Sequence, residues 1–394
     1  MDDEEDNNDY QVSNLLRANI ELEEDIFSLK VAGYVREAYF DKDRNFSNLE
    51  EAFIKYEKGN FTALLGNQVY NWTIMEVFTL GDNYNARNLA ASSSDTERLG
   101  LPSLNMRYEF EESFIQFVSI FQTPASHFAQ KRNRLGIQFD LQDPEFLIDN
   151  NETGDADFTQ YIFRFKKFFD NFEFDFHYAR KFDTAYPIIV IDKPQGVSPS
   201  SVDDLDIRPY YQPVKQTYIS LQGEFWESLL KFEYLKVDFD NLEVEFFVPP
   251  NTLNQATQLD FQKVTLGYEK AHDYKNNHSA TFLVEYTTVL GVTYEEARTL
   301  GAFQRDIMLG YRHNFNDFKS HQLQFALITD LQEYDETAFS MKHSMRANNY
   351  WTIETTLSVI ETAKPDSDNL AESYYGLKPI RESDNILFNV IRFF

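Results

Sequence analysis

The chain has 394 residues, a net charge of −28 and no cysteine, which excludes disulfides, thiolate metal sites and cysteine nucleophiles. Its 64 Asp and Glu residues outnumber 36 Lys and Arg residues, and this balance argues against a nucleic acid partner, because phosphate binding needs basic side chains. No apolar run approaches the ~20 residues that a membrane-spanning helix needs.

The chain opens on an acidic stretch. Met1 is followed by Asp2, Asp3, Glu4, Glu5 and Asp6, the opposite of the basic and then apolar start of a secretory signal. We therefore expect residues 1–10 to be disordered. We also expect the sequence to be the mature form of an exported protein, without its signal peptide.

From residue 11 onward the dominant pattern is the alternation of apolar and polar residues with period two, which predicts β-strands. The strand candidates run for about nine to twelve residues, longer than the usual ~5–6 and close to the ~9–11 that cross a membrane at a tilt. We count 18 strands, while 16 stays possible. They lie near 11–23, 26–39, 48–57, 61–68, 103–110, 113–122, 131–141, 157–167, 172–182, 213–222, 228–238, 258–268, 278–289, 301–312, 321–331, 338–347, 350–360 and 385–394.

Short turns such as 58–60, 111–112, 170–171 and 347–348 separate some strands, and long polar loops separate others. The long loops lie near 69–103, 183–212, 239–257 and 361–384. A count of 18 strands places 69–103 and 183–212 at opposite ends, so a strand in the N-terminal third is miscounted or loop 69–103 is special. Residues 294–298 predict a helical turn within a loop, and residues 11–394 form one domain.

The alternation favours a transmembrane antiparallel β-barrel of about 16–18 strands over a soluble all-β fold. The polar parity is charged on strand after strand, as a wet lumen requires, and the apolar parity is rich in Phe and Tyr. A closed barrel also removes the unpaired edges that hydrocarbon does not tolerate.

The last residues resemble the terminal recognition strand of bacterial outer-membrane proteins. Phe388, Val390 and Phe394 place apolar residues at alternate positions and end the chain on an aromatic, so we expect them to form an assembly signal. Arg392 departs from this pattern, although an Arg at the interface can extend its head to lipid headgroups.

Residues 49–88 resemble the N-terminal hairpin of the alginate-export-like superfamily of porin-like outer-membrane proteins. The matching positions are Ala52, Phe53, Gly66, Gln68, Trp72, Asp82, Asn85 and Arg87, and the departures are Asn67, Thr73 and Ala86. The resemblance implies a monomeric barrel that handles a polymer, a lipid-like molecule or a small organic solute. Gln68, Trp72, Asp82, Asn85 and Arg87 are candidates for a loop that constricts the lumen, while Trp72 could equally be an interfacial residue.

The alternation assigns a set of polar residues to the lumen. The pore-lining candidates are Arg17, Glu21, Lys30, Arg36, Arg107, Arg134, Arg164, Lys166, Glu173, Asp175, His177, Lys231, Glu233, Glu285, Asp306, Arg312 and Glu354. They either line a hydrated path or form ion pairs that brace and partly plug the barrel.

The sequence contains no motif for catalysis, for a cofactor or for a metal site. None of the seven histidines has the spacing of a zinc protease motif, and no Gly-x-Ser-x-Gly elbow or phosphate-binding loop appears. Acidic stretches near 149–157 and 203–206 are interpreted as solvated loops, with weak binding of Ca²⁺ or bridging of lipopolysaccharide through divalent ions as the alternative.

We therefore expect a non-enzymatic outer-membrane channel for passive or substrate-selective diffusion of small solutes, with a preference for cations. Its expected partners are membrane lipid, lipopolysaccharide, the outer-membrane assembly machinery and a small or oligomeric solute. The alternatives are a structural or adhesive barrel that binds a partner through acidic loops, and a component of an export pore.

Overall fold

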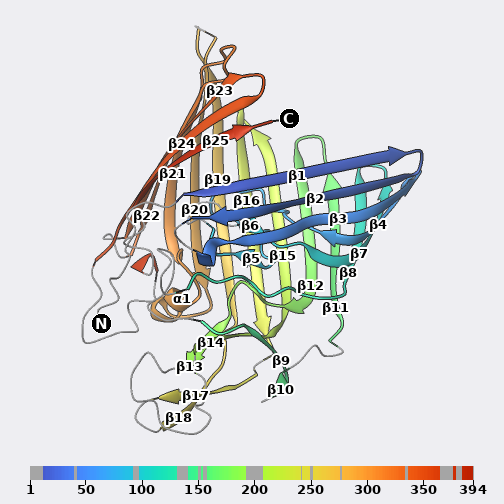
Figure 1. Ribbon diagram of the computed structural model, residues 1–394, viewed down its shortest axis with the longest axis vertical. Helices are drawn as coiled ribbons and strands as arrows, with labels where there is room; N and C mark the ends of the chain where they lie inside the picture. The colour runs from blue at the N-terminus through green and yellow to red at the C-terminus, as the bar shows by residue number, and fades with distance from the viewer. Residues whose placement is uncertain are drawn as a thin grey trace.

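The computed structural model shows an all-β chain (Figure 1). It describes residues 12–39, 42–91, 97–130, 141–149, 152–153, 158–191, 207–240, 242–248, 252–275, 277–332, 336–363, 376–378 and 384–393. The predicted acidic stretch 1–10, Arg134 and Phe394 lie outside these residues.

One antiparallel sheet of 17 strands dominates the structure, and each strand pairs with the next sheet strand in the chain. Its strands are β1 Ser13–Glu24, β2 Phe27–Ala38, β3 Phe46–Lys58, β4 Phe61–Gln68, β7 Leu101–Phe110, β8 Ser113–Ile120, β11 Gln160–Phe168, β12 Phe172–Phe182, β15 Pro213–Phe225, β16 Ser228–Phe239, β19 Phe261–Asp273, β20 Ser279–Leu290, β21 Arg305–Asn314, β22 Gln322–Asp330, β23 Thr337–Asn348, β24 Trp351–Glu361 and β25 Asn385–Arg392. The predicted all-β class, the antiparallel pairing and the strand number between 16 and 18 are confirmed.

The count of 18 strands is wrong by one for this sheet. Strand β8 pairs directly with β11, from Ile120 opposite Gln160 to Ser113 opposite Lys167, so the predicted strand 131–141 does not stand between them. Residues 131–140 lie outside the described part of the chain. The whole stretch 121–159 instead connects β8 to β11. With one strand fewer, loops 69–103 and 183–212 no longer fall at opposite ends of the sheet.

The short and long connections segregate to opposite ends of the sheet, which we call the turn end and the loop end. The turn end carries the connections 25–26, 59–60, 111–112, 169–171, 226–227, 274–278, 315–321 and 349–350. The loop end carries 39–45, 69–100, 121–159, 183–212, 240–260, 291–304, 331–336 and 362–384. Loop 69–100 therefore lies at the same end as 183–212.

The sheet curls but is not closed. Strands β1–β4 cross in front of the strands of the middle of the chain (Figure 1), and among the described residues β1 pairs only with β2 and β25 only with β24. Because the number of strands is odd, β1 and β25 both run from the loop end to the turn end. A direct pairing of these two edges would be parallel.

The two faces of the sheet have inverted polarity relative to a soluble sheet. The buried face carries Glu233, Glu285, Asp175 and His177, none of them more than 2 % exposed. The opposite face exposes large apolar side chains along the middle of the strands. They include Phe117, Phe163, Leu230, Leu266, Phe282 and Leu309, each 39–50 % exposed.

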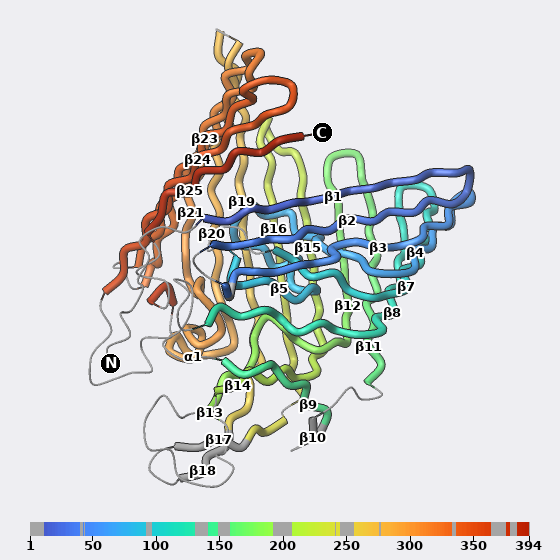
Figure 2. The backbone as a smooth tube through the Cα atoms, viewed as in Figure 1, coloured from blue at the N-terminus to red at the C-terminus, as the bar shows by residue number. Residues whose placement is uncertain are grey.

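A small four-stranded sheet and a two-stranded ribbon lie at the loop end, below the main sheet in Figure 2. A four-stranded sheet contains β9 Glu145–Asp149, β10 Glu152–Thr153, β13 Ile188–Ile191 and β14 Ile207–Tyr211. The pairs β5 Arg87–Asn88 with β6 Glu97–Arg98, and β17 Val244–Val248 with β18 Thr252–Ala256, are separate ribbons. A 3₁₀ turn, η1, covers Lys42–Arg44.

The predicted helical turn is confirmed as α1, Tyr294–Thr299. Thr293 caps its first turn by accepting from the Glu296 N–H, and Glu296 reaches back to the backbone N–H of Thr293, as in a capping box. Among the described residues, no helix has the length and apolar character to span a bilayer.

A substitution on the exposed apolar face tests whether that face lies in a lipid bilayer. Leu309→Arg should lower the free energy of unfolding by about 2–4 kcal/mol in lipid vesicles, because an Arg at the bilayer midplane is costly. Leu309 is 50 % exposed, so in water the same change should stay within about 0.5 kcal/mol. Urea unfolding of the refolded protein measures the difference.

Phe225→Arg is the matched control, since Phe225 is similarly exposed but ends β15 at the turn end. It should cost about 0–1 kcal/mol near an interface. Equal effects of the two substitutions in vesicles would contradict a bilayer around the exposed face.

Candidate functional site

The candidate site is built by residues 69–91 and 97–100, which we call the inserted segment. It leaves the sheet after β4 and returns at β7. Gly66 starts this departure with a φ of +133°, and a Cβ there would lie 2.1 Å from the Ala52 carbonyl oxygen. Only glycine fits both conditions, so the end of β4 can pass close to the backbone of β3.

The inserted segment touches opposite walls of the curled sheet. On one side Tyr34 and Arg36 of β2 both contact the Glu97 carboxylate. On the other side the segment reaches β16 and β20 through Glu233 and Glu285. It therefore crosses the space that the polar face encloses.

Two buried carboxylates hold the crossing residues. Glu233 accepts from the Thr73 hydroxyl at 2.6 Å, from the Ile74 N–H at 2.6 Å and from the Leu80 N–H at 2.8 Å. Residues 73–80 form no strand, so these N–H groups take side-chain acceptors in place of a ladder partner.

Glu285 binds the adjacent part in the same way. It accepts from the N–H groups of Glu76, Val77 and Phe78 at 2.6–3.0 Å. Hydrogen bonds from N–H groups to an ionised acceptor are the strong class, and they compensate the burial of both charges. Both glutamates were predicted to face the lumen, but as pore-lining charges and not as anchors.

Trp72 lies at the centre of an aromatic and ionic cluster on the inner wall. Its ring is 4.8 Å from the His177 ring and 4.9 Å from the Tyr84 ring, and the Arg164 guanidinium stacks on it at 4.7 Å. Trp72 therefore packs against the inner wall of the sheet, and its role as a constriction residue stays a prediction.

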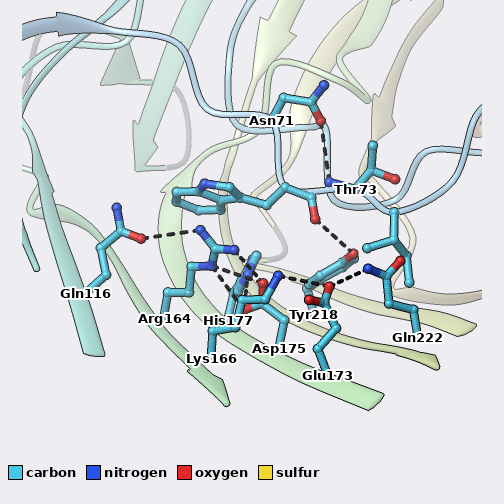
Figure 3. Close-up of polar contacts among 12 residues, drawn as sticks. Asn71, Thr73, Gln116, Arg164, Lys166, Glu173, Asp175, His177, Tyr218 and Gln222 are labelled. Atoms are coloured by element: carbon cyan, nitrogen blue, oxygen red, sulfur yellow. Dashed lines mark hydrogen bonds and ion pairs between the residues drawn. The ribbon is translucent and has the colours of Figure 1, made fainter. Parts of the chain in front are cut away.

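Arg164, Asp175 and His177 form a connected row of polar contacts (Figure 3). Arg164 donates to both carboxylate oxygens of Asp175 and reaches Gln116 at 3.4 Å. His177 Nε2 lies 2.8 Å from Asp175, and His177 Nδ1 lies 2.8 Å from the Tyr84 hydroxyl.

Burial raises the pKa of Tyr84 far above its ordinary value, so its hydroxyl stays protonated. Tyr84 then donates to His177 Nδ1, and His177 Nε2–H donates to Asp175. Each polar group of the row is satisfied, and His177 is fully buried. The row thus fixes Trp72 and Tyr84 to the wall.

A second network closes the base of the inserted segment. Asn85 donates to the carbonyl oxygens of Gln68 and Leu99 and accepts from the Tyr70 N–H. The Asp82 carboxylate lies between Arg98 and Arg87, with Arg98 Nε at 2.7 Å and Arg87 Nη2 at 2.9 Å. Thus Gln68, Trp72, Asp82, Asn85 and Arg87 all belong to one folded loop or its root.

The remaining pore-lining candidates lie mostly in ion pairs. Toward the turn end, the N–O distances are 2.5 Å for Lys30–Glu51, 2.9 Å for Lys166–Glu173, 2.9 Å for Lys231–Glu269 and 3.1 Å for Lys342–Glu354. Arg17 and Glu50, 3.3 Å apart, lie nearer the loop end. Arg107 pairs with Glu109, Arg312 pairs with Glu76 of the inserted segment, Glu21 lies opposite Lys30, and Asp306 lies opposite Asp330.

Sequence reasoning missed Thr73, Tyr84, Gln216 and Tyr218. Tyr218 packs on His177 at 4.7 Å, and Gln216 donates to Asn83 of the inserted segment at 2.8 Å. A signal for them exists, because Gln216, Tyr218, Ser220 and Gln222 alternate along β15 on the polar parity. Their contact with the inserted segment joins residues more than 130 positions apart and has no local signal.

The predicted assembly residues of β25 face outward. Phe388 and Val390 lie opposite Thr355 and Ile353 and are 61 % and 53 % exposed. Arg392 shares their face and lies over the Trp351 ring at 5.4 Å, so it is accommodated by an aromatic neighbour.

No family model matches the sequence, and no curated protein matches it. Among solved structures, the chain is similar to Wzi of Escherichia coli, described as an outer membrane protein involved in group 1 capsule assembly and a carbohydrate-binding β-barrel. That alignment has 8 % identity and a TM-score of 0.48 and covers 88 % of this chain and 74 % of Wzi.

It is also similar to OccAB1 of Acinetobacter baumannii, with 10 % identity, 97 % and 89 % of the two chains covered and a TM-score of 0.48. The alignment with OpdO of Pseudomonas aeruginosa has 8 % identity and a TM-score of 0.48, and it covers 89 % of this chain and 85 % of OpdO. The resemblance of residues 49–88 to the alginate-export-like superfamily stays a prediction.

Glu285→Ala tests the anchoring of the inserted segment. It removes the acceptor of three N–H groups, and each unsatisfied buried donor costs about 1–3 kcal/mol. We expect hydrogen exchange at Glu76, Val77 and Phe78 to rise at least about tenfold, since about 1.4 kcal/mol corresponds to a factor of ten. Mass-spectrometric hydrogen exchange measures it.

Glu269→Ala is the control, because Glu269 pairs with Lys231 nearer the turn end. It should leave exchange in residues 73–80 unchanged. Unchanged exchange in Glu285→Ala as well would show that the carboxylate does not hold the segment.

Proposed function

We propose that the chain is a bacterial outer-membrane β-barrel whose lumen passes small solutes around the inserted segment. The observation that carries the proposal is the inverted polarity of the sheet, with apolar side chains exposed outside and a charged, covered face inside. A lipid-facing barrel needs this arrangement, and a soluble sheet would bury the opposite face.

The connections support the same location. Short turns at one end and long loops at the other are the asymmetry of outer-membrane barrels, with the long loops outside the cell. With the long loops outside the cell, strand β25 ends at the periplasmic side. Of its alternating apolar residues, Phe388 lies at the middle of the strand and Val390 lies nearer that side. We propose that this strand is the one that the assembly machinery recognises.

The charged residues on the inner face favour the passage of small, polar solutes. Lys166 with Glu173 and Lys231 with Glu269 lie on the inner face between the inserted segment and the turn end. Such alternating charges hold a hydrated path. The inserted segment narrows that path at the level of Glu233 and Glu285, which favours small solutes over folded partners.

A catalytic role has less support. The Asp175–His177–Tyr84 row has the order of an acid, a histidine and a hydroxyl, but His177 is 0 % exposed and lies under Trp72. A reacting group must reach its substrate, so we propose a positioning role for this row.

We further propose a preference for cations. The chain has a net charge of −28, and the lumen bases Arg164, Lys166, Lys231 and Lys342 each pair with a carboxylate. Pairing neutralises the local positive charge, so the acidic excess determines the field along the path.

A second candidate function is partner binding at the loop end. Leu147, Ile188, Val190, Leu242 and Val244 form a separate apolar cluster there, outside the main sheet. A folded layer with its own core is more than a set of solvated connections, and it favours an adhesive or partner-binding role for that end.

Planar-bilayer recording tests the channel. The wild-type protein should give conductance steps, and Glu233→Ala/Glu285→Ala should give larger steps, because the freed segment no longer narrows the lumen. Glu354→Ala, which removes the ion pair with Lys342 of β23, is the control and should leave the step size close to that of the wild type. If neither the wild type nor the double variant gives conductance steps at any voltage, the channel proposal is wrong.

The sign of the selectivity is measured separately, from the reversal potential under a tenfold KCl gradient. We expect a potential that favours K⁺ and that shrinks as both salt concentrations rise, because ions screen the lumen charges beyond a Debye length of about 10 Å at 0.1 M. A potential that favours Cl⁻ would contradict the cation preference while leaving the channel intact.

A further inference from the structure

Five of the seven histidines lie near the turn end of neighbouring strands. They are His272 on β19, His278 just before β20, His313 on β21, His321 just before β22 and His343 on β23. By alternation His313 shares the outward parity of Leu309, and His343 pairs with Leu323 on the outward parity of Leu327. The row is therefore on the outside of the sheet and separate from the inserted segment.

Four of these imidazoles form two close pairs with nitrogen facing nitrogen. His278 Nδ1 lies 3.1 Å from His313 Nε2, and His321 Nδ1 lies 3.4 Å from His343 Nε2. Phe315 packs between them, 4.7 Å from the His313 ring and 6.2 Å from the His321 ring. The two pairs are thus distinct sites.

The pairs repeat one arrangement in the sheet. Ala280 lies opposite His313, and His278 precedes Ala280 by two positions. Leu323 lies opposite His343, and His321 precedes Leu323 by two positions. Both pairs are therefore diagonal neighbours on one face, the relation that lets long side chains of adjacent strands meet.

In the first pair, one imidazole has a hydrogen-bond partner at its other nitrogen, since His313 Nδ1 is 2.9 Å from the Tyr311 hydroxyl oxygen. In the second pair, the Asp317 carboxylate lies 4.0 Å from His321 Nε2, beyond hydrogen-bond distance but close enough for charge attraction. A proton on His313 Nδ1 leaves the lone pair of Nε2 directed at His278. Histidines that bind metals characteristically have such a partner on the second nitrogen.

We propose that each pair binds a divalent transition-metal ion of the Zn²⁺ or Cu²⁺ class. A tetrahedral ion with Zn–N bonds of about 2.0–2.1 Å requires its nitrogens to lie about 3.3–3.4 Å apart. The distances of 3.1 and 3.4 Å need little adjustment. Imidazole suits these metals, and Cu²⁺ binds most tightly in the Irving–Williams order.

Each ion would complete its coordination with water. Within the described ranges, no three or more His, Cys, Asp or Glu side chains gather around one point. The sites are therefore two-histidine sites with open positions. The proposal does not rest on the proposed function, because it concerns the outer face and needs no open lumen.

Calorimetric titration of the refolded protein with Zn²⁺ tests the proposal. We expect two ions per chain for the wild type, one for His313→Ala, one for His343→Ala and none for the double variant. Electron paramagnetic resonance with Cu²⁺ should show two nitrogen ligands per ion in each single variant.

His272→Ala is the matched control, since His272 lies in the same row but packs against Tyr274 at 4.7 Å. It should keep both ions. His278→Ala and His321→Ala repeat the test from the other side of each pair, and heat-modifiable migration on a gel identifies folded variants. Absence of Zn²⁺ binding to the wild type, or two ions bound by the folded double variant, would overturn the proposal.

Discussion

The contact between the inserted segment and two buried carboxylates is the interaction on which the interior of this protein depends. Residues 73–80 form no strand, so their N–H groups need acceptors other than a neighbouring strand. Glu233 and Glu285 supply them from β16 and β20. Five N–H groups and one hydroxyl donate to the two carboxylates. The same six hydrogen bonds therefore anchor the inserted segment and compensate the burial of the two carboxylates.

Those bonds also explain how apolar residues are tolerated on a polar inner wall. Leu283 and Met308 face inward, and Phe78 of the inserted segment packs on them. Trp72 and Tyr84 likewise cover the Arg164–Asp175–His177 row. The segment therefore covers the apolar parts of the wall at the loop end, while ion pairs occupy the wall toward the turn end. Outside, the exposed Phe and Leu side chains have the reverse requirement and suit hydrocarbon.

Strand direction adds a constraint that pairing alone does not reveal. Both edges of the sheet, β1 and β25, run from the loop end to the turn end. Antiparallel pairing, which forms all the neighbour contacts in this sheet, cannot join them directly. The histidine row depends on the antiparallel order of consecutive strands. Each hairpin returns to the turn end, so residues near that end of neighbouring strands lie side by side.

The sequence by itself determined the class of fold, most of the strands, the alternation of side chains along each strand and the helical turn at Tyr294. Alternation with period two is a local property, and it assigns a side chain to a face without knowledge of the partner strand. It also placed Arg164, Asp175, His177, Glu233 and Glu285 on the inner face. It overestimated the strand count at 131–141, where it could not detect that β8 pairs directly with β11.

Only the tertiary structure decided what the inner residues touch. Glu233 lies 153–160 residues from its partners and Glu285 more than 200 from its own, and such contacts depend on how the whole sheet curls. The same holds for the histidine pairs, which are 22 and 35 residues apart. A local pattern carries no information about curvature or about the path of a loop, and these alone brought the acceptors to the inserted segment.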